Sequence, residues 1–234
     1  MSEQGVRRVR TMVHLLRHGE EHNPEGILYV RAPGYYLTKR GRAMAERIAE
    51  SIGDRDITHI VTSPLERAQE TAAPLAAVRK LTPVLDERVI ESENAFAGAK
   101  FTIKQSLVLK PSVWPKLVNP FRPSWGEPYK QIAERMWPAV TDARDAALGH
   151  EALIVSHQLP IWITRLHAEG KRFVHDPRDR QCTLASLTTF TFDGEQLETV
   201  TYSEPAGDLI PEADRKSAFS AGGAEDDDET GGSN

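Results

Sequence analysis

The segment at residues 12–20 reads Met12-Val13-His14-Leu15-Leu16-Arg17-His18-Gly19-Glu20 and decides the fold. Its first five residues are mainly apolar, and such a short run is typical of a buried strand. The run ends directly in a cation, an imidazole and a glycine. Ligands of open α/β sheets bind outside the carboxyl ends of the strands. The segment therefore predicts a sheet with a polar site at its edge.

The rest of the chain alternates between short apolar runs and helical patterns. Further strands are expected at 59–62 with Ile57 before it, at 152–155, and at 185–192 and 197–202, where Asp193-Gly194 joins a hairpin. Helices are expected at about 39–52, 65–78 and 128–148, with a shorter one after Pro160. This alternation is typical of an α/β fold. We predict a three-layer α/β/α sandwich around a mostly parallel sheet.

Residues 93–128 interrupt the alternation. The segment contains Pro111, Pro115, Pro120, Pro123 and Pro128 together with Trp114, Phe121 and Trp125. The prolines exclude one long helix, and the aromatic residues are unlike a free linker. We therefore expect a helical or irregular cap insert that packs on the core and overhangs the site.

Charge is distributed unevenly along the 234 residues, whose formal net charge is −5. From Glu204 onward the chain has nine acids and two bases, so the tail carries −7 and the first 203 residues carry +2. We predict one globular domain at 1–203 and an acidic, disordered tail at 204–234. The nearly neutral body has no basic patch for nucleic acid.

The composition also bears on the compartment. Cys182 is the single cysteine, which excludes an intrachain disulfide. No signal peptide and no run of apolar residues long enough for a membrane span is visible. We expect a cytoplasmic protein without a membrane partner, and no pattern indicates an oligomeric state.

Two further expected strands end in the same kind of side chains as the first. Residues 59–62 lead to Ser63-Pro64-Leu65-Glu66-Arg67, and residues 152–155 lead to Ser156-His157. With Arg17 and His18, two arginines and two histidines gather at one edge of the sheet. Convergence at three strand ends is hard to explain by solubility alone.

These groups suit phosphoryl transfer, which depends on positioning and on electrostatic stabilisation. Arg17 and Arg67 can each bind two phosphoryl oxygens through a planar guanidinium. A neutral His18 can attack phosphorus and form a phosphohistidine. His157, when protonated, would stabilise the transition state.

The leaving alcohol needs a proton. A carboxylic acid near a phosphate dianion has a raised pKa, because a like charge disfavours ionisation. Glu91 is the candidate general acid, and the spacing leaves Glu87 and Glu93 open as alternatives.

From about Val13 to Tyr202 the chain resembles the histidine phosphatase superfamily, the phosphoglycerate mutase-like proteins. The resembling segments are Leu16-Arg17-His18-Gly19-Glu20 followed by Asn23, Leu37-Thr38-Lys39-Arg40-Gly41, Thr62-Ser63-Pro64-Leu65-Glu66-Arg67-Ala68-Gln69-Glu70-Thr71-Ala72, Gly126-Glu127 followed by Arg135, and Val155-Ser156-His157. Such motifs in this order and spacing are specific when taken together.

This resemblance implies a role for each candidate. His18 would be the phosphorylated nucleophile, and Glu91 the proton donor. The phosphate pocket would consist of Arg17, Arg67 and His157, with Asn23 as a further contact. The resemblance also implies that hydrolysis needs no metal and no organic cofactor.

The chain departs from the family pattern on the substrate side. Asn94-Ala95-Phe96-Ala97-Gly98 lacks the usual tryptophan and glutamate, and residues 29–36 lack an aspartate. Gln158 replaces the glycine that usually follows the second histidine, and we include it among the candidate substrate contacts. These departures concern the identity of the substrate more than the chemistry.

The spacing of three histidines near the N-terminus raises the question of a metal site. His14, His18 and His22 recur every four residues, as metal ligands do on a helix. The local pattern is a strand followed by a turn at Gly19, so the three histidines would not share a face. We predict no metal site here.

The sequence thus predicts a metal-independent phosphomonoesterase that acts on a small phosphorylated substrate through a phosphohistidine on His18. One alternative is phosphoglycerate mutase-type transfer, which the scattered cations of the insert disfavour. The other is a catalytically silent protein that binds phospho-ligands. The presence of both arginines, both histidines and an acid disfavours that alternative.

Overall fold

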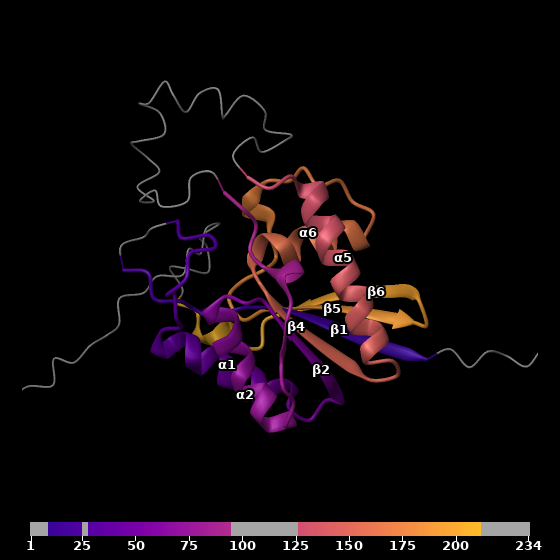
Figure 1. The fold of residues 1–234 in the computed structure, drawn as a ribbon, viewed down its shortest axis with the longest axis horizontal. Coiled ribbons are helices and arrows are strands. Elements are labelled where there is room, and N and C mark those ends of the chain that lie inside the picture. Colours follow the sequence, from indigo (N-terminus) through magenta and orange to yellow (C-terminus); the bar gives the residue numbers. More distant parts are fainter. Residues whose placement is uncertain (1–8, 25–27, 95–125, 212–234) are drawn as a thin grey trace, which may run out of the picture.

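The computed structural model describes residues 9–24, 28–94 and 126–211. These residues form one six-stranded sheet with the order β3-β2-β4-β1-β5-β6 (Figure 1). Its strands are β1 (Arg10–Arg17), β2 (Ile57–Thr62), β3 (Val84–Leu85), β4 (Glu151–Ser156), β5 (Leu187–Asp193) and β6 (Gln196–Ser203). The first four strands run parallel, and β5 and β6 are antiparallel. The predicted mostly parallel sheet with an antiparallel hairpin is confirmed.

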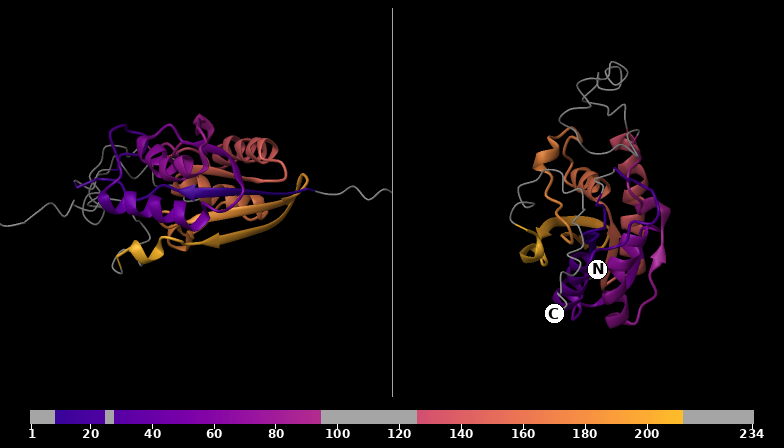
Figure 2. Two further views of the ribbon diagram at one scale, coloured as in Figure 1. Left: turned by 90° about the horizontal axis from the view of Figure 1, so that it is seen from below. Right: turned by 90° about the vertical axis from the view of Figure 1, so that its left-hand side faces the viewer.

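Helices cover both faces of the sheet, which confirms the three-layer arrangement (Figures 1 and 2). On one face, α1 (Lys39–Ile52) packs beside α2 (Glu66–Arg79). On the other, α5 (Tyr129–Ala146) packs beside α6 (Gln158–Ala168). Three short 3₁₀ helices complete the described elements: η1 (Glu87–Val89), η3 (Pro177–Asp179) and η4 (Gly207–Leu209).

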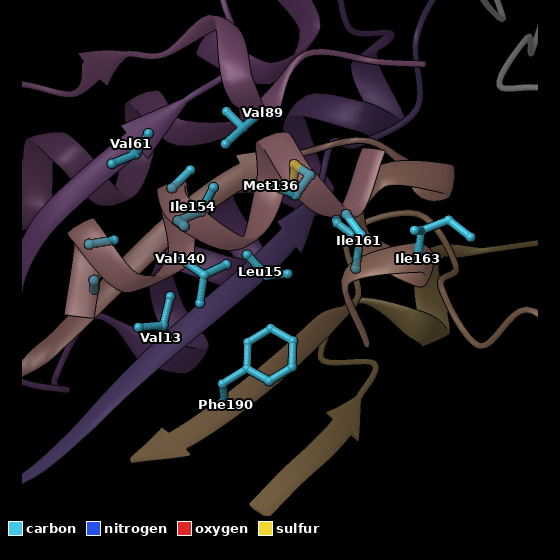
Figure 3. Packing of buried hydrophobic residues seen from close by; sticks show 14 of the residues in the cluster. Val13, Leu15, Val61, Val89, Met136, Val140, Ile154, Ile161, Ile163 and Phe190 are labelled. Atoms are coloured by element: carbon cyan, nitrogen blue, oxygen red, sulfur yellow. The ribbon is translucent and has the colours of Figure 1, made fainter. Parts of the chain in front are cut away.

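The alternation of side chains along β1 divides the core into two parts. Val13 and Leu15 point to the face covered by α5 and α6, where Figure 3 shows them with Phe190. Leu16 points to the opposite face and packs with residues of α1 and α2. Each fully buried side chain of this size stabilises the fold by about 1.5–3 kcal/mol. Because β1 is buried on both faces, its position and register are strongly defined.

The ends of the predicted insert lie side by side. Asn94 and Gly126 form an isolated antiparallel bridge, and the amide of Glu127 donates to the carbonyl of Glu93 at 3.1 Å. A Cβ at Gly126 would lie 2.8 Å from that carbonyl oxygen, so this crossing requires glycine. The cap itself falls at 95–125, outside the described residues, and stays a prediction.

The packed body extends beyond Ser203, where the sequence placed the start of the tail. Helix η4 contacts α1, and Ala206 and Ile210 are buried among the apolar residues of that face. Gly207 and Asp208 lie between these apolar side chains, which hid their contribution to the core in the sequence. Among the described helices, none combines the length and apolar character that a membrane crossing requires.

Candidate active site

Backbone hydrogen bonds join the carboxyl ends of the three central strands. The amide of His18 donates to the carbonyl of Ser156 at 3.1 Å, and the amide of Ser63 donates to the carbonyl of Val155 at 2.9 Å. The loops after β1, β2 and β4 therefore meet at one edge of the sheet. The structure brings together the side chains that the sequence placed at these strand ends.

The turn after β1 packs directly on the first turn of α1 through two glycines. A Cβ on Gly41 would lie 1.9 Å from the carbonyl oxygen of Glu20, and a Cβ on Gly19 would lie 2.6 Å from the carbonyl oxygen of Gly41. Thr38 caps α1 by accepting from the Gly41 amide at 2.9 Å, and its hydroxyl donates to the Glu20 carboxylate at 2.7 Å. The backbone beside His18 is thereby held in place.

His18 is buried and presents one ring nitrogen to the site. Its Nδ1 lies 2.7 Å from the carbonyl oxygen of Gly19. A carbonyl only accepts, so Nδ1 carries the proton and Nε2 keeps its lone pair. Burial lowers the pKa of His18, and the charges of Arg67 and Arg17 act in the same direction. A neutral imidazole with a free Nε2 lone pair is the form that can attack phosphorus.

His157 lies beside His18, with ring centroids 5.1 Å apart. Its Nε2 is 2.8 Å from the hydroxyl of Ser63, which also accepts from the Leu65 amide at 3.3 Å. The Ser63 hydroxyl can therefore donate its hydrogen to Nε2 of His157. In the neutral ring, the proton then sits on Nδ1. That buried Nδ1 has no hydrogen-bond partner within the described part of the chain. Burial, followed by the charges of Arg67, His18 and Arg17, holds the pKa of His157 well below its usual range.

Arg67 supplies the main cation of the site and is fully buried. Its Nη2 donates to the carbonyl of Val30 at 2.8 Å, and its guanidinium lies 4.7 Å from the ring centroid of Tyr29. Its Nε and Nη1 are buried without a hydrogen-bond partner in the described ranges. An unsatisfied buried donor costs about 1–3 kcal/mol. Nε and Nη1 lie on different edges of the guanidinium, so each can donate to a separate acceptor.

Arg17 and Gln158 converge on one carbonyl. Arg17 Nη1 donates to the carbonyl oxygen of Cys182 at 2.8 Å, and Gln158 Nε2 lies 3.4 Å from the same oxygen. The thiol of Cys182 is buried, which raises its pKa to about 11. Cys182 is thus a small residue of the core. Its backbone contributes to the site by orienting Arg17.

The three carboxylates proposed as proton donors lie in different surroundings. Glu87 is exposed in η1, and the Glu93 side chain is 70% exposed and binds Arg31. Glu91 is half-buried, and its Oε1 accepts from the Ser92 amide at 2.7 Å. The charge of Glu91 also opposes the lowering of the Arg67 pKa that burial causes. The surroundings favour Glu91 over its two rivals.

A hydrogen-bond network holds the backbone that carries Glu91. Arg31 Nε donates to the Glu91 carbonyl at 2.6 Å, and Arg31 Nη2 donates to the Glu127 carboxylate at 3.2 Å. Arg135 Nε donates to Glu127 at 2.7 Å, and its Nη1 donates to the Arg88 carbonyl at 2.6 Å. Glu127 and Arg135 thus hold the loop that carries Glu91.

Two charged residues of the site were missed by the sequence reasoning. Glu21 is fully buried, with Oε2 3.3 Å from Nδ1 of His18. Arg180 donates through Nε to His175 at 2.8 Å, and its charge is felt by Cys182. Burial lowers the pKa of Arg180, and Glu91 is among the groups that oppose this shift. Both residues lie in loops without periodicity, so only their proximity in the fold indicates a role.

The remaining candidates are placed as follows. Asn23 is buried in the loop after β1, and its proposed phosphate contact stays a prediction. His14 faces away from the site and bonds Thr189 and Glu151, each at 2.8 Å, whereas His22 is exposed. Within the described ranges, no three His, Cys, Asp or Glu side chains cluster as a set of metal ligands.

A sequence profile of the histidine phosphatase superfamily (branch 1) matches residues 13–205. The chain belongs to the histidine phosphatase superfamily. A superfamily relative, the uncharacterized protein Rv0525 of Mycobacterium tuberculosis, is 52% identical over 196 residues, which cover 84% of this chain and 97% of that protein. The probable phosphoglycerate mutase GpmB of Photorhabdus laumondii is 29% identical over 184 residues, covering 75% and 83%.

Solved histidine phosphatase-like structures share the fold. YhfR of Bacillus stearothermophilus superimposes with a TM-score of 0.67 at 25% identity and covers 80% of this chain and 94% of its own. A phosphoserine phosphatase of Entamoeba histolytica, solved in complex with 3-phosphoglyceric acid, superimposes with a TM-score of 0.66 at 20% identity, covering 84% and 99%. The resemblance predicted from the motifs is therefore confirmed at the level of the superfamily.

Proposed function

We propose that this protein is a metal-independent phosphomonoesterase that works through a phosphohistidine on His18. The observation that carries this proposal is the set of buried donors beside the nucleophile. Arg67 Nε, Arg67 Nη1 and His157 Nδ1 have no hydrogen-bond partner among the described residues. A phosphoryl group, with its charge spread over three oxygens, would accept hydrogen bonds from donors of this set.

In the first step Nε2 of His18 attacks phosphorus, and the bond between phosphorus and the ester oxygen breaks. The leaving oxygen takes the proton of Glu91. In the second step water attacks phosphorus, the bond to Nε2 breaks, and the Glu91 carboxylate takes a proton from the water. Inorganic phosphate leaves, and both side chains return to their starting forms.

We further propose that the substrate is a small phosphoester with a second anionic group. Arg180 supports this, because it is a partly buried cation whose charge interacts with Glu91. His175 accepts from its Nε and holds it in place. The Entamoeba neighbour named above binds 3-phosphoglyceric acid, which carries a carboxylate beside its phosphate.

Mutase-type transfer is the second candidate, and the similarity to a probable phosphoglycerate mutase supports it. A mutase returns the phosphoryl group to another hydroxyl and must exclude water while it does so. Incubation with 3-phosphoglycerate and a bisphosphoglycerate primer separates the two activities. Rapid formation of 2-phosphoglycerate without phosphate release would favour the mutase.

The direct test of the phosphatase is hydrolysis of an aryl phosphate in EDTA, combined with acid-quench isolation of the phosphoenzyme. We expect turnover and an acid-labile phosphohistidine in the wild type, and neither in His18→Ala. His150→Ala is the matched control, because His150 is exposed and pairs with Asp56 at the opposite end of β4. Equal turnover in His18→Ala and wild type would reject the mechanism. Binding of phospho-ligands without turnover would favour the silent alternative.

A further inference from the structure

Glu21 is a carboxylate inside a pocket built to attract anions. We propose that it is a positioning residue, whose charge lies beside the Nδ1–H of His18 and stabilises the positive ring of the phosphohistidine. This inference rests on the proposed function and adds a residue that the reaction has so far not used. Glu21 acts through His18 and does not touch the substrate.

The main chain on both sides of Glu21 is pinned, so the direction of its side chain is defined. Glu21 and Leu37 form an isolated antiparallel bridge, and the amide of His22 donates to the carbonyl of Tyr36 at 2.8 Å. The Glu21 side chain is 0% exposed. The next-door carboxylate, Glu20, instead binds Thr38 and Arg40 and serves the packing of α1.

The two carboxylate oxygens of Glu21 have different partners. Tyr29 donates its hydroxyl to Oε1. Oε2 lies 3.3 Å from Nδ1 of His18, within ion-pair distance, and has no hydrogen-bond partner among the described residues. The Nδ1 proton is donated to the carbonyl oxygen of Gly19 at 2.7 Å, and the carboxylate lies beside this N–H group. One carboxylate oxygen is thus held by Tyr29, and the other faces the nucleophile.

A buried carboxylate is costly unless charge and hydrogen bonds compensate it. Burial alone would raise the pKa of Glu21, but His18, Arg67 and Arg17 outweigh burial and lower it. The carboxylate is thus ionised in the free protein. In that state it repels an incoming phosphate dianion, so its benefit must come at a later stage of the reaction.

That stage is the covalent intermediate. When Nε2 bonds to phosphorus, Nδ1 keeps its hydrogen and the imidazole ring becomes positively charged. A carboxylate at hydrogen-bond range stabilises this ring more than it stabilises the neutral ring of the free protein. It also keeps Nδ1 protonated, so His18 leaves as neutral imidazole when water attacks phosphorus. Glu21 therefore favours the intermediate over bound phosphate.

The test is Glu21→Gln, which removes the charge and keeps the shape. We expect formation of the phosphoenzyme in rapid-quench experiments to slow by about tenfold, and inhibition by inorganic phosphate to tighten by about tenfold. Tenfold changes are typical of the interaction between partly screened charges a few ångströms apart. Damage to the pocket would weaken both phosphate binding and catalysis, so the opposite signs identify an electrostatic role.

The pH profile gives a second readout. Glu21 raises the pKa of His18 against the lowering by burial, Arg67 and Arg17. His157, which lies beside the ring, is unchanged in Glu21→Gln, as are Arg67 and Arg17. The acid limb of kcat/KM should therefore move to lower pH. Glu46→Gln, which removes a carboxylate at an exposed position of α1, is the control, and we expect phosphate inhibition and the acid limb to stay at wild-type values.

Two further experiments distinguish a failure of the role proposed for Glu21 from a failure of the proposed function. Phosphate binding and the His18 titration can be followed by NMR in wild type and Glu21→Gln, even if the wild type forms no phosphoenzyme. If Glu21→Gln does not fold, Glu21→Asp keeps the charge but withdraws it from Nδ1. We then expect slower phosphorylation with little change in phosphate inhibition. Weaker or unchanged phosphate binding in Glu21→Gln, or faster phosphorylation in either variant, would overturn the role assigned to Glu21.

Discussion

A single methyl group added at Gly41 should push the turn after β1 away from α1. A Cβ at Gly41 would lie 1.9 Å from the carbonyl oxygen, 2.9 Å from the carbonyl carbon and 3.0 Å from the nitrogen of Glu20. All three are backbone atoms, so no side-chain rotation relieves the contact. In Gly41→Ala the turn after β1 must move away from α1 by roughly 1 Å or more, the difference from an ordinary van der Waals contact.

The expected cost follows from the contacts that this movement breaks. Overpacking a close contact costs about 1–3 kcal/mol. The bond from the Thr38 amide to the Glu20 carbonyl, at 3.0 Å, and the bond from the Thr38 hydroxyl to the Glu20 carboxylate, at 2.7 Å, would add about 1 kcal/mol each. Alanine in a helix otherwise gains about 1 kcal/mol over glycine. The net prediction is a loss of roughly 2–4 kcal/mol.

Urea denaturation measures the free energy of unfolding, and steady-state hydrolysis of an aryl phosphate measures catalysis. Because His18 directly precedes Gly19, we expect kcat/KM to fall by about 100-fold, the scale of a 1 Å displacement of a catalytic group. Arg42→Ala is the control: it places alanine at the next position of the same helix and should change stability by about 0.5 kcal/mol or less. A Gly41→Ala protein that is as stable as wild type with unchanged kcat/KM would refute the reasoning.

Three other predictions concern the phosphate pocket, the substrate side and the pH dependence of stability. Ser63→Ala removes the partner of His157 Nε2, and kcat/KM should fall by about tenfold; an unchanged value would show that Ser63 does not orient the ring. Arg180→Met should raise KM at least tenfold for a phosphoester that carries a carboxylate and leave KM for an aryl phosphate unchanged, whereas Arg178→Met, at an exposed position of the same loop, should change neither. Burial alone would raise the pKa of Glu151, but bonds from His14 and Arg55 hold it at about 2, below the ordinary value of 4.5. Ionised Glu151 therefore contributes about 1–2 kcal/mol to the free energy of unfolding, after discounting for solvent screening. This contribution is present above pH 4.5 and is lost as the pH falls towards 2. Glu151→Gln should remove this part of the pH dependence in urea titrations, and an identical slope in both proteins would contradict it.

Most of the fold could be predicted from local patterns in the sequence. The apolar runs that became β1, β2 and β4 were visible because buried parallel strands are apolar on both faces. Helices α1 and α5 had clear periods of about 3.6 residues, and Asp193-Gly194 marked the hairpin, with Gly194 at φ 60°. The missed apolar residues after Ser203, such as Ile210, have no period because they flank a short 3₁₀ helix that packs on α1.

The sequence by itself determined which groups stand at the strand ends: Arg17, His18, Arg67 and His157. The parallel order of the strands sends all carboxyl ends to one edge, so a pattern local to each strand was sufficient. Only the tertiary structure decided which groups from the loops join them. It left Glu87 and Glu93 exposed but Glu91 half-buried, buried Glu21 beside His18, and placed the charge of Arg180 where it acts on Glu91. Those placements depend on contacts between side chains far apart in the chain or in irregular loops, where sequence spacing does not determine distance.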